Sequence, residues 1–449
     1  MSLYEKLVER ERAGRPIAVG LVGAGQMGTG LVSQVACMQG MRVVAIADIA
    51  IERARGALLA AGVPEAAIVE AADQATALAA LAAGQRVITR NADLLPQLAP
   101  LEAIIEATGV PDLGARIAFS AILGRKHIVL LNVETDVTVG PLLKRMADLA
   151  GVVYTGAAGD EPAATLELYQ FARALGLTVL CAGKGKNNPL DRSATPESLA
   201  AEARAKGTAP KMLCSFVDGT KTMVEMAALA NATGLPPSRR GLHGPHSSTL
   251  DLPRIFAPVE QGGILEQPGV VDYAIGDVAP GVFVVFTSEL PVVVDELRYL
   301  KMGDGPNWAL YRPYHLTSIE TPLSVARAVL EGEATIAPTH GLVAEVITVA
   351  KRALRAGEQI DGIGGSTVYG LIERAEVARA EQLLPLGLAQ HAVLLRDLAV
   401  GEPITYADVV LDESQTVVQL RRLQDQWLGH APSARRPVPL VTNGVSIPA

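Results

Sequence analysis

A glycine-rich turn between an apolar run and an amphipathic stretch constrains the fold of this chain more than any other feature. Residues 17–22 read IAVGLV, which predicts a buried strand, and GAGQMGTG follows at once. Gly23, Gly25 and Gly28 have the G-x-G-x-x-G spacing, which suits a tight turn, a close approach of pyrophosphate and close packing of helix on strand. The free N–H groups at the start of the helix would bind phosphate. We therefore expect a strand–turn–helix unit that binds a dinucleotide.

A second predicted strand supplies the acidic residue that such a unit needs. The run MRVVAIAD ends in Asp48, 20 residues after Gly28, where a carboxylate binds the ribose hydroxyls of the cofactor. Asp48 favours NAD, but Arg53 lies just beyond it and could accept the 2′-phosphate of NADP. Both cofactors stay open on these residues. Gln26 and Met27 complete the predicted cofactor contacts within the turn.

Alternating β and α segments continue along the first third of the chain. A strand over 103–109, a helix over 112–124 and a strand over 127–134 predict a doubly wound parallel sheet of the Rossmann type. Ligands of such sheets bind at the carboxyl ends of the strands. We therefore expect four residues near the nicotinamide, with loop capping as the alternative: Thr108, Gly109, Asn132 and Glu134.

The stretch GKGKNN follows the apolar run LTVLCA, itself preceded by a predicted helix over about 161–175. We expect Lys184, Lys186, Asn187 and Asn188 at the end of that strand, projecting toward the cofactor crevice. Gly183 and Gly185 would let the backbone wrap an anion, and the ammonium and amide groups suit a phosphate. The alternative is a solvent-exposed loop that carries lysines.

The segment 212–237 has apolar residues at helical spacing. On one continuous helix, Asp218, Lys221, Thr222 and Glu225 would share a face, with Gly219 inside the helix. Two carboxylates and an ammonium on one stripe suit general acid–base chemistry or a divalent cation. A salt-bridged surface is the alternative.

Further candidate groups lie in two segments of the middle of the chain. His243 and His246 lie in a glycine- and proline-containing loop and lack the spacing of a helical metal pair. The extended segment 306–322 holds Arg312, which suits a phosphate, and His315, which suits proton transfer. Ordinary packing is the alternative for both.

The last third begins with a predicted helix near Pro322, which we expect to lead the chain back to the first domain. Residues 361–370, DGIGGSTVYG, form a predicted hinge or ligand loop. Residues 384–412 predict short strands with a Gly-Glu-Pro turn, and RDLAVGEPITYADV resembles the SAF domain, a small β-rich module named from sialic acid synthase and antifreeze proteins.

Composition limits the classes of protein to which the chain can belong. At 449 residues it is long enough for two or three domains. A net charge of −8 argues against a general nucleic-acid binder. Three cysteines without a C-x-x-C pair suit a reducing compartment. No apolar run approaches the roughly 18 residues that span a bilayer. We expect a cytoplasmic protein with no membrane or nucleic-acid partner.

The motifs AGKGKNNP and VDGTKTMVEMA, the glycine turn and the terminal module together resemble the deoxyxylulose-5-phosphate-reductoisomerase-like enzymes, often labelled predicted homoserine dehydrogenases. The resemblance covers essentially the whole chain. It implies a Rossmann domain (1–155), an α+β catalytic domain (156–350) and a linker with a small β-rich SAF domain (351–449). Some members convert 1-deoxy-D-xylulose 5-phosphate to 2-C-methyl-D-erythritol 4-phosphate, an isoprenoid precursor, with NADPH. This favours NADP as cofactor.

One departure from related families affects the chemistry. Homoserine dehydrogenases and the main reductoisomerases carry a lysine after the asparagine near the nicotinamide, where this chain has Val133. A cation for developing oxyanion charge would then come from Lys184, Lys186 or Lys221. The clustered metal carboxylates of the main reductoisomerases have no clear match in this sequence, so Mg²⁺ or Mn²⁺ is only an option.

The sequence thus leads to the hypothesis of an NADPH-dependent reductoisomerase acting on a small phosphorylated sugar, in a homo-oligomer. Asp218 or Glu225 would act as base or cation ligand, and Lys186 or Lys221 would stabilise the oxyanion. The phosphate would be bound by Lys184, Asn187, Asn188 and Arg312, and His315 would carry a proton. One alternative is an NAD(P)-dependent dehydrogenase of homoserine or another small hydroxy compound. The other is a nucleotide-sensing or assembly protein without catalysis.

Overall fold

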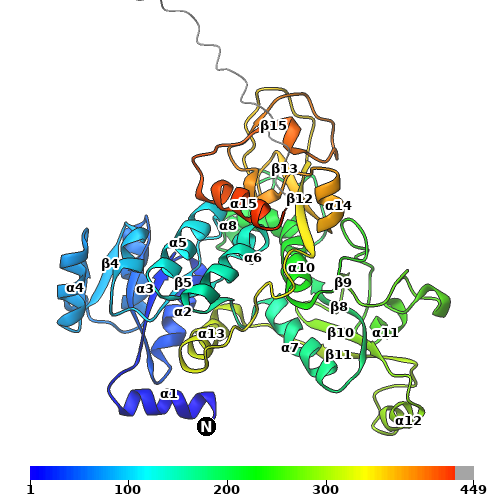
Figure 1. Ribbon diagram of the computed structural model, residues 1–449, viewed down its shortest axis with the longest axis horizontal. Coiled ribbons are helices and arrows are strands. Elements are labelled where there is room, and N and C mark those ends of the chain that lie inside the picture. The colour runs from blue at the N-terminus through cyan, green and yellow to red at the C-terminus, as the bar shows by residue number, and fades with distance from the viewer. Residues whose placement is uncertain (430–449) are drawn as a thin grey trace, which may run out of the picture.

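Seven parallel strands form the largest sheet of the chain, at the left of Figure 1. The computed structural model describes residues 1–429. The strands of this sheet are β1 (Ile17–Val22), β2 (Met41–Ala47), β3 (Ile68–Glu70), β4 (Arg86–Thr89), β5 (Ala103–Glu106), β6 (His127–Leu130) and β7 (Tyr154–Gly156). Their order is β3-β4-β2-β1-β5-β6-β7, so the strand order reverses between β1 and β5. The predicted doubly wound α/β fold is confirmed, and the reversal is where such sheets bind ligands.

Helices cover both faces of this sheet because its buried strands present apolar side chains on each side. On one face the core joins Val19 and Leu21 to α2 (Gln26–Ala36), α3 (Ile51–Ala60) and α13 (Thr317–Glu331). The other face is covered by α4 (Gln74–Ala82), α5 (Pro111–Leu123) and α6 (Val133–Ala150). Helix α1 (Leu3–Arg12) contacts α13, and α13 contacts α2. The helix expected near Pro322 therefore does lead the chain back to the first sheet.

A second sheet of four strands lies at the right of Figure 1. Its order is β11 (Asn307–Arg312), β10 (Val282–Thr287), β8 (Thr178–Lys186) and β9 (Val270–Ile275). Only β8 and β9 run parallel; the other two pairs are antiparallel. Helices α7 (Glu161–Ala174) and α10 (Thr220–Thr233) pack against this sheet and against each other. Smaller helices complete this part of the chain: α8 (Ala200–Ala205), α9 (Pro210–Val217), α11 (Leu252–Ile255) and α12 (Pro291–Tyr299).

The end of the described chain folds into short strands that lie above α10 in Figure 1. The hairpin of β12 (Ala344–Ala350) and β13 (Val368–Arg374) is followed by α14 (Ala375–Ala380), β14 (Val393–Leu394) and β15 (Val409–Val410). The predicted short strands over 384–412 are thus present. Helix α15 (Thr416–Trp427) returns to α5 and α6, where the Gln424 side chain accepts a hydrogen bond from the Leu142 N–H at 3.0 Å.

Five short 3₁₀ segments join these elements: Glu65–Ala67, Ala92–Gln97, Val259–Gln261, Leu386–Leu388 and Tyr406–Asp408. The three domain boundaries and the SAF resemblance stay predictions, and residues 430–449 of the third predicted domain lie outside the described part. No helix within residues 1–429 has both the length and the apolar character required to cross a membrane.

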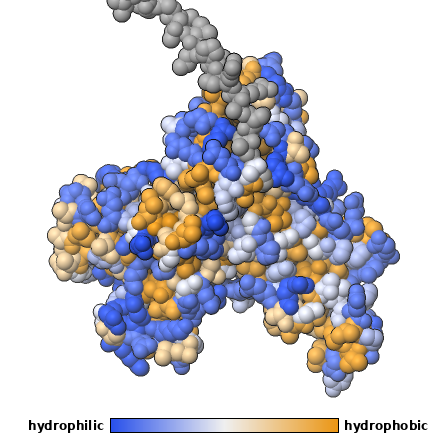
Figure 2. Space-filling view, in the orientation of Figure 1, coloured by the Kyte–Doolittle hydropathy of each residue, from blue (hydrophilic) through white to orange (hydrophobic). Residues whose placement is uncertain are grey.

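Helix α12 exposes apolar side chains to solvent. It contains no buried residue, and the side chains of Val292 and Tyr299 are 74% and 81% exposed. Figure 2 shows an apolar area at the lower right, where Figure 1 places α12. Exposed apolar surface of this kind is typical of contacts between proteins, and the homo-oligomer stays a prediction.

Candidate functional site

The glycine turn has the backbone geometry that a pyrophosphate requires. Gly23 adopts φ +97°, and a Cβ on Gly28 would lie 2.1 Å from the Gly23 carbonyl oxygen. A Cβ on Gly25 would meet no atom within 4 Å, and Gly25 caps α2 without a side-chain hydrogen bond. Space and free N–H groups therefore coincide at the helix start. The residues present fit a dinucleotide.

Asp48 braces this turn from the end of β2. Its carboxylate accepts the N–H of Ala24 at 2.7 Å and the N–H of Ala50 at 2.8 Å. Arg53 is exposed on α3, and Gln26 is the first residue of α2. These positions are compatible with the predicted ribose contacts, and they leave NAD and NADP equally open.

Two neighbouring strands end earlier than the sequence predicts, and the first of them, expected over 103–109, ends at Glu106. The strand expected over 127–134 ends at Leu130, because Asn132 caps α6 by accepting the Thr135 N–H at 3.1 Å. The Asn132 amide also donates to the Val110 carbonyl at 3.0 Å, so it ties the two strand ends together. Asn132 is fully buried and has the capping role that the sequence left as its alternative.

A cavity of about 550 Å³ opens between the two large sheets and the C-terminal part. Predicted site residues that line it are Met27, Thr108, Gly109, Glu134, Lys184, Lys186, Asn187, Asn188, Lys221, Thr222, Glu225 and His315. The residues predicted to lie near the nicotinamide and those of the GKGKNN stretch thus line the same cavity. Its size suits a small ligand together with part of a cofactor.

Lysines and carboxylates alternate along one wall of this cavity. Lys184 Nζ forms an ion pair with Glu161 at 2.6 Å and a second, shorter one with Glu225. Lys221 Nζ lies 3.0 Å from Glu134. His315 Nε2 lies 3.4 Å from Glu161, and its Nδ1 donates to the Pro280 carbonyl at 2.7 Å.

Burial and pairing shift the pKa values of these groups in different directions. Burial disfavours the charged form of Lys184, but Glu161 and Glu225 outweigh it and raise its pKa above the ordinary value. Glu134 and Glu225 do the same for the pKa of Lys221. Burial, and then repulsion from Glu161, raises the pKa of Glu225. The neighbouring carboxylates therefore favour the charged form of both Lys184 and Lys221.

Lys186 differs from Lys184 and Lys221 because no carboxylate among the described residues pairs with it. Its Nζ donates to the Phe216 carbonyl at 2.6 Å and forms no ion pair within 4.0 Å in the part of the chain that the structure describes. Burial, followed by repulsion from Lys184, lowers the pKa of Lys186 to about 8. An ammonium with that pKa can gain and lose a proton near neutral pH.

Two of the predicted catalytic and substrate-binding residues have other partners and do not line the cavity. Asp218 pairs with Lys351 at 2.9 Å, and its side chain is fully buried. Arg312 pairs with Glu320 at 2.7 Å and with Glu167 at 3.0 Å. Both guanidinium partners are carboxylates, so a phosphate would have to displace them.

The prediction of one continuous helix over 212–237 is wrong. Helix α9 ends at Val217, and Gly219, at φ +86°, precedes α10. The left-handed backbone at Gly219 turns the chain, so Asp218 points away from the face that carries Lys221 and Glu225. The predicted stripe of four residues is therefore split.

The predicted mobile role of two glycines is also wrong. Gly183 and Gly185 lie inside β8, where an added Cβ would be 2.0 Å from the Asp272 carbonyl oxygen and 2.2 Å from the Ala279 nitrogen. These glycines allow close packing and hold Lys184 and Lys186 on a rigid strand. His243 belongs to the same region: its Nδ1 lies 2.8 Å from Asp272, and like His246 it does not line the cavity.

Sequence reasoning missed residues from two segments. Asp160 and Glu161 begin α7, and with Glu225 they form a cluster whose carboxylate oxygens lie within 4.8 Å of one another. The signal was GDEP, which follows β7 after two alanines and starts α7 with two acids and a proline. Gln390 of the C-terminal part also lines the cavity and was missed, whereas Asp361, which lines it too, belongs to the segment 361–370 that the sequence predicted as a hinge or ligand loop.

One family comparison identifies part of the chain as similar to an oxidoreductase. Residues 159–321 match the family described as the catalytic domain of oxidoreductase DRL. No curated protein matches the chain. Among solved structures, a "probable dehydrogenase" from Thermotoga maritima is 10% identical over 72% of this chain and 92% of its own, with a TM-score of 0.43. Scyllo-inositol dehydrogenase from Lactobacillus casei is 12% identical over 73% and 93%, with a TM-score of 0.42. We draw nothing about activity from these two structures.

Proposed function

We propose that this protein is an NAD(P)-dependent oxidoreductase that interconverts a carbonyl and an alcohol on a small, oxygen-rich substrate. Two observations support the class: the glycine turn fits a dinucleotide, and the cavity-lining segment 159–321 is similar to an oxidoreductase catalytic domain. We therefore prefer the NAD(P)-dependent dehydrogenase, which the sequence left as an alternative, to the reductoisomerase.

The proposal rests mainly on the position and the lowered pKa of Lys186. Its ammonium borders the cavity that Thr108 and Gly109 border from the other sheet, and its pKa is about 8. When bound, the cofactor supplies or accepts the hydride. Lys186 then gives its proton to the carbonyl oxygen during reduction and removes it from the hydroxyl during oxidation. The rigid strand β8 holds the ammonium at one place.

Lys184 and Lys221 would stabilise the negative charge that develops on the substrate oxygen. Both ammonium groups are buried and stay charged because carboxylates surround them. Fixed charges in a site with little water stabilise developing charge without reorganising. Asn187 and Asn188 add amide donors at the end of the strand, which suits hydroxyl or anionic groups of the substrate.

Oxidation of NADH and NADPH by the purified protein tests this proposal against a panel of small aldehydes and ketones, including aspartate semialdehyde. We expect Lys186→Met to lower kcat by about 10² to 10⁴, with the Kd for cofactor unchanged. Lys206→Met is the matched control, because Lys206 lies next to α8 and its side chain is half exposed. Unaltered kcat in Lys186→Met would overturn the assignment of the proton donor.

The reductoisomerase reading is the second candidate, and the carboxylate cluster favours it. A divalent cation held by Asp160, Glu161 and Glu225 could bind two neighbouring substrate oxygens during a carbon–carbon rearrangement. The fit is only partial, because the Lys184 ammonium already contacts Glu161 and Glu225 and a cation would have to displace it. NADPH oxidation with 1-deoxy-D-xylulose 5-phosphate, with and without Mg²⁺ or Mn²⁺, tests this reading. Turnover of homoserine or aspartate semialdehyde without turnover of the sugar phosphate would exclude it, and no turnover with any substrate would favour a nucleotide sensor.

A further inference from the structure

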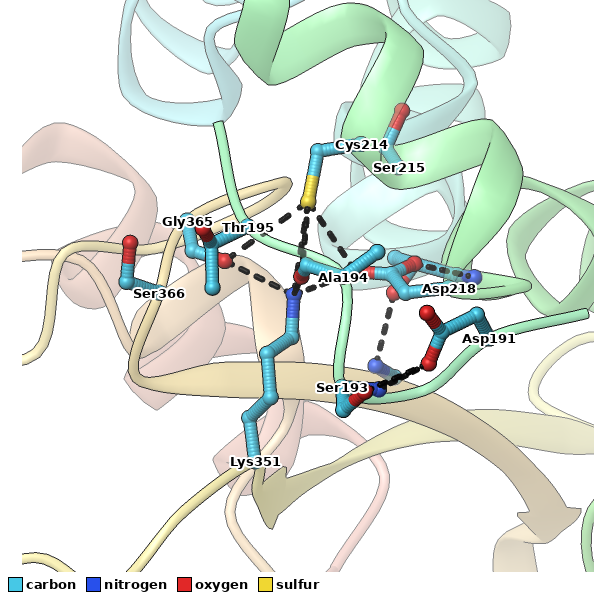
Figure 3. A network of polar contacts seen from close by, with 12 residues as sticks. Asp191, Ser193, Ala194, Thr195, Cys214, Ser215, Asp218, Lys351, Gly365 and Ser366 are labelled. Atoms are coloured by element: carbon cyan, nitrogen blue, oxygen red, sulfur yellow. Dashed lines mark hydrogen bonds and ion pairs between the residues drawn. The ribbon is translucent and has the colours of Figure 1, made fainter. Parts of the chain in front are cut away.

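A fully buried lysine, Lys351, lies directly after β12 and does not line the cavity. Only 1% of the Lys351 side chain is exposed. Its ammonium donates to the carbonyls of Gly365 at 2.7 Å and Ala194 at 2.8 Å, and to Asp218 Oδ2 at 2.9 Å (Figure 3). These three oxygen acceptors match the three N–H bonds of an ammonium group, and Cys214 Sγ also lies 3.4 Å from the same nitrogen.

The partners of Lys351 come from three segments that are distant in the sequence. Ala194 lies in the connection after β8, Asp218 lies at the break between α9 and α10, and Gly365 lies in the C-terminal part. Asp218 Oδ1 also accepts the Thr220 N–H at 2.9 Å, which fixes the start of α10. Lys351 therefore joins all three segments through one buried charge, and a buried charge that loses its partner is strongly destabilising.

Residues 361–365, which we call the DGIGG loop, border the candidate site. Asp361 and Ile363 line the cavity together with Gln390. The Asp361 carboxylate accepts the Ser366 N–H at 2.6 Å and the Thr367 N–H at 3.1 Å, so the loop braces itself. The loop is thus already ordered by contacts within the protein.

The DGIGG loop also packs closely on the N-terminal turn of α9. Gly364 has φ +65°, and an added Cβ would lie 2.0 Å from the Lys211 carbonyl oxygen. Lys211 Nζ donates to the Asp361 carbonyl at 3.1 Å. Lys211 and Met212 line the same end of the cavity. The loop and α9 therefore form one continuous wall there.

We propose that the DGIGG loop is a specificity-determining wall of the candidate site and that Lys351 is the positioning residue that holds it against α9. Lys211 of α9 and Gln390, which line the cavity together with this loop, would contact an oxygen-rich end of the substrate. The C-terminal part of the chain thereby selects the substrate of the oxidoreductase, a role that rests on the proposed function. The sequence motif DGIGG serves as a ligand loop in this proposal.

Gly364→Ala tests the wall, with Gly357→Ala as the matched control. Both glycines have positive φ, but a Cβ at Gly357 would meet nothing within 4 Å. We expect Gly364→Ala to raise the KM for the carbonyl substrate roughly tenfold to a hundredfold, with kcat and the Kd for cofactor nearly unchanged. Gly357→Ala should change none of these. Equal KM values for the two variants would contradict the proposal that the DGIGG loop determines substrate specificity.

The pair Lys351→Met with Asp218→Asn tests the positioning role without leaving one buried charge unpaired. The Asp218→Asn change keeps a side-chain oxygen that can accept the Thr220 N–H. The control pair is Arg355→Met with Asp397→Asn, which removes an exposed ion pair in the same part of the chain. We expect faster hydrogen exchange of residues 361–367 and a raised KM in the Lys351→Met, Asp218→Asn protein. The control pair should show neither change.

Hydrogen exchange separates the failure of this proposal from the failure of the proposed function. Unchanged exchange in the Lys351→Met, Asp218→Asn protein would overturn the positioning role. Faster hydrogen exchange of residues 361–367 with an unchanged KM would contradict the role of the DGIGG loop in substrate specificity. If the wild-type protein turns over no carbonyl substrate, the proposed function fails and the wall's role in specificity fails with it, while exchange still decides whether Lys351 holds the loop.

Discussion

Replacing Glu106 by glutamine should stabilise the protein at pH 8 much more than at pH 5. Glu106 ends β5 and has no exposed surface. Its Oε1 accepts the Thr108 N–H at 2.9 Å and also the Thr108 hydroxyl, whereas its Oε2 has no partner among the described residues. Burial outweighs the hydrogen bonds from Thr108 and raises the pKa of Glu106 to about 7.

The size of the effect follows from the difference between the folded and unfolded pKa values. The ordinary pKa is 4.5, so a folded pKa of about 7 corresponds to about 3 kcal/mol. Between pH 4.5 and pH 7 the unfolded chain loses this proton before the native protein does. The free energy of unfolding therefore falls as pH rises through this window, and the full cost is present above the folded pKa. Glutamine carries no charge and keeps an oxygen for the Thr108 N–H.

Urea unfolding of the protein without cofactor, at pH 5 and at pH 8, measures this difference. We expect the gain in unfolding free energy from Glu106→Gln to be larger at pH 8 than at pH 5 by about 2 kcal/mol. Glu52→Gln is the control, because Glu52 is 80% exposed on α3. A gain that is the same at both pH values would refute a buried carboxyl group with a raised pKa.

Three further predictions concern the cofactor, the proton donor and a corrected residue. Gly28→Ala should abolish NADH binding in a fluorescence titration, because its Cβ would lie 2.1 Å from the Gly23 carbonyl oxygen, whereas Gly56→Ala on α3 meets nothing within 4 Å and should bind normally. The kcat/KM for carbonyl reduction should fall about tenfold per pH unit above pH 8, as Lys186 loses its proton; a profile that stays flat to about pH 10 would exclude Lys186 as the acid. Arg312→Met should lower the melting temperature by breaking the ion pairs with Glu320 and Glu167 but leave the KM for a phosphorylated substrate unchanged, and a large rise in KM would restore the phosphate role.

The cofactor end was predictable because its signals are local. The turn at Gly23, Gly25 and Gly28 needs only neighbouring residues, and strand–helix alternation follows from apolar periodicity within short windows. The strand over 127–134 was too long because a buried capping asparagine, Asn132, looks like a strand residue in the sequence. A capping bond forms only once α6 exists.

The partners of the charged residues were not predictable, because they depend on contacts between distant elements. Lys184 of β8 reaches Glu161 of α7 and Glu225 of α10, and no spacing in the sequence encodes that meeting. Helical spacing predicted Asp218 as a site residue. The left-handed backbone at Gly219 breaks the helix, so Asp218 does not share the face of Lys221 and Glu225. Helical spacing is informative only where the helix is unbroken.

Val133 has a structural explanation as a departure from the homoserine dehydrogenases, to which the sequence was compared. It is the first residue of α6 and is buried, so a lysine at this position could not be accommodated without a partner. The next residue, Glu134, instead receives the ammonium of Lys221 from α10 at 3.0 Å. A cation therefore reaches the same strand end from the opposite side of the cavity. The ammonium group comes from α10, which packs against the second sheet, and it already contacts Glu134 in this structure. The same arrangement makes Glu134 an attachment point for α10 as well as a candidate nicotinamide neighbour, and its replacement should affect both the orientation of Lys221 and the binding of cofactor.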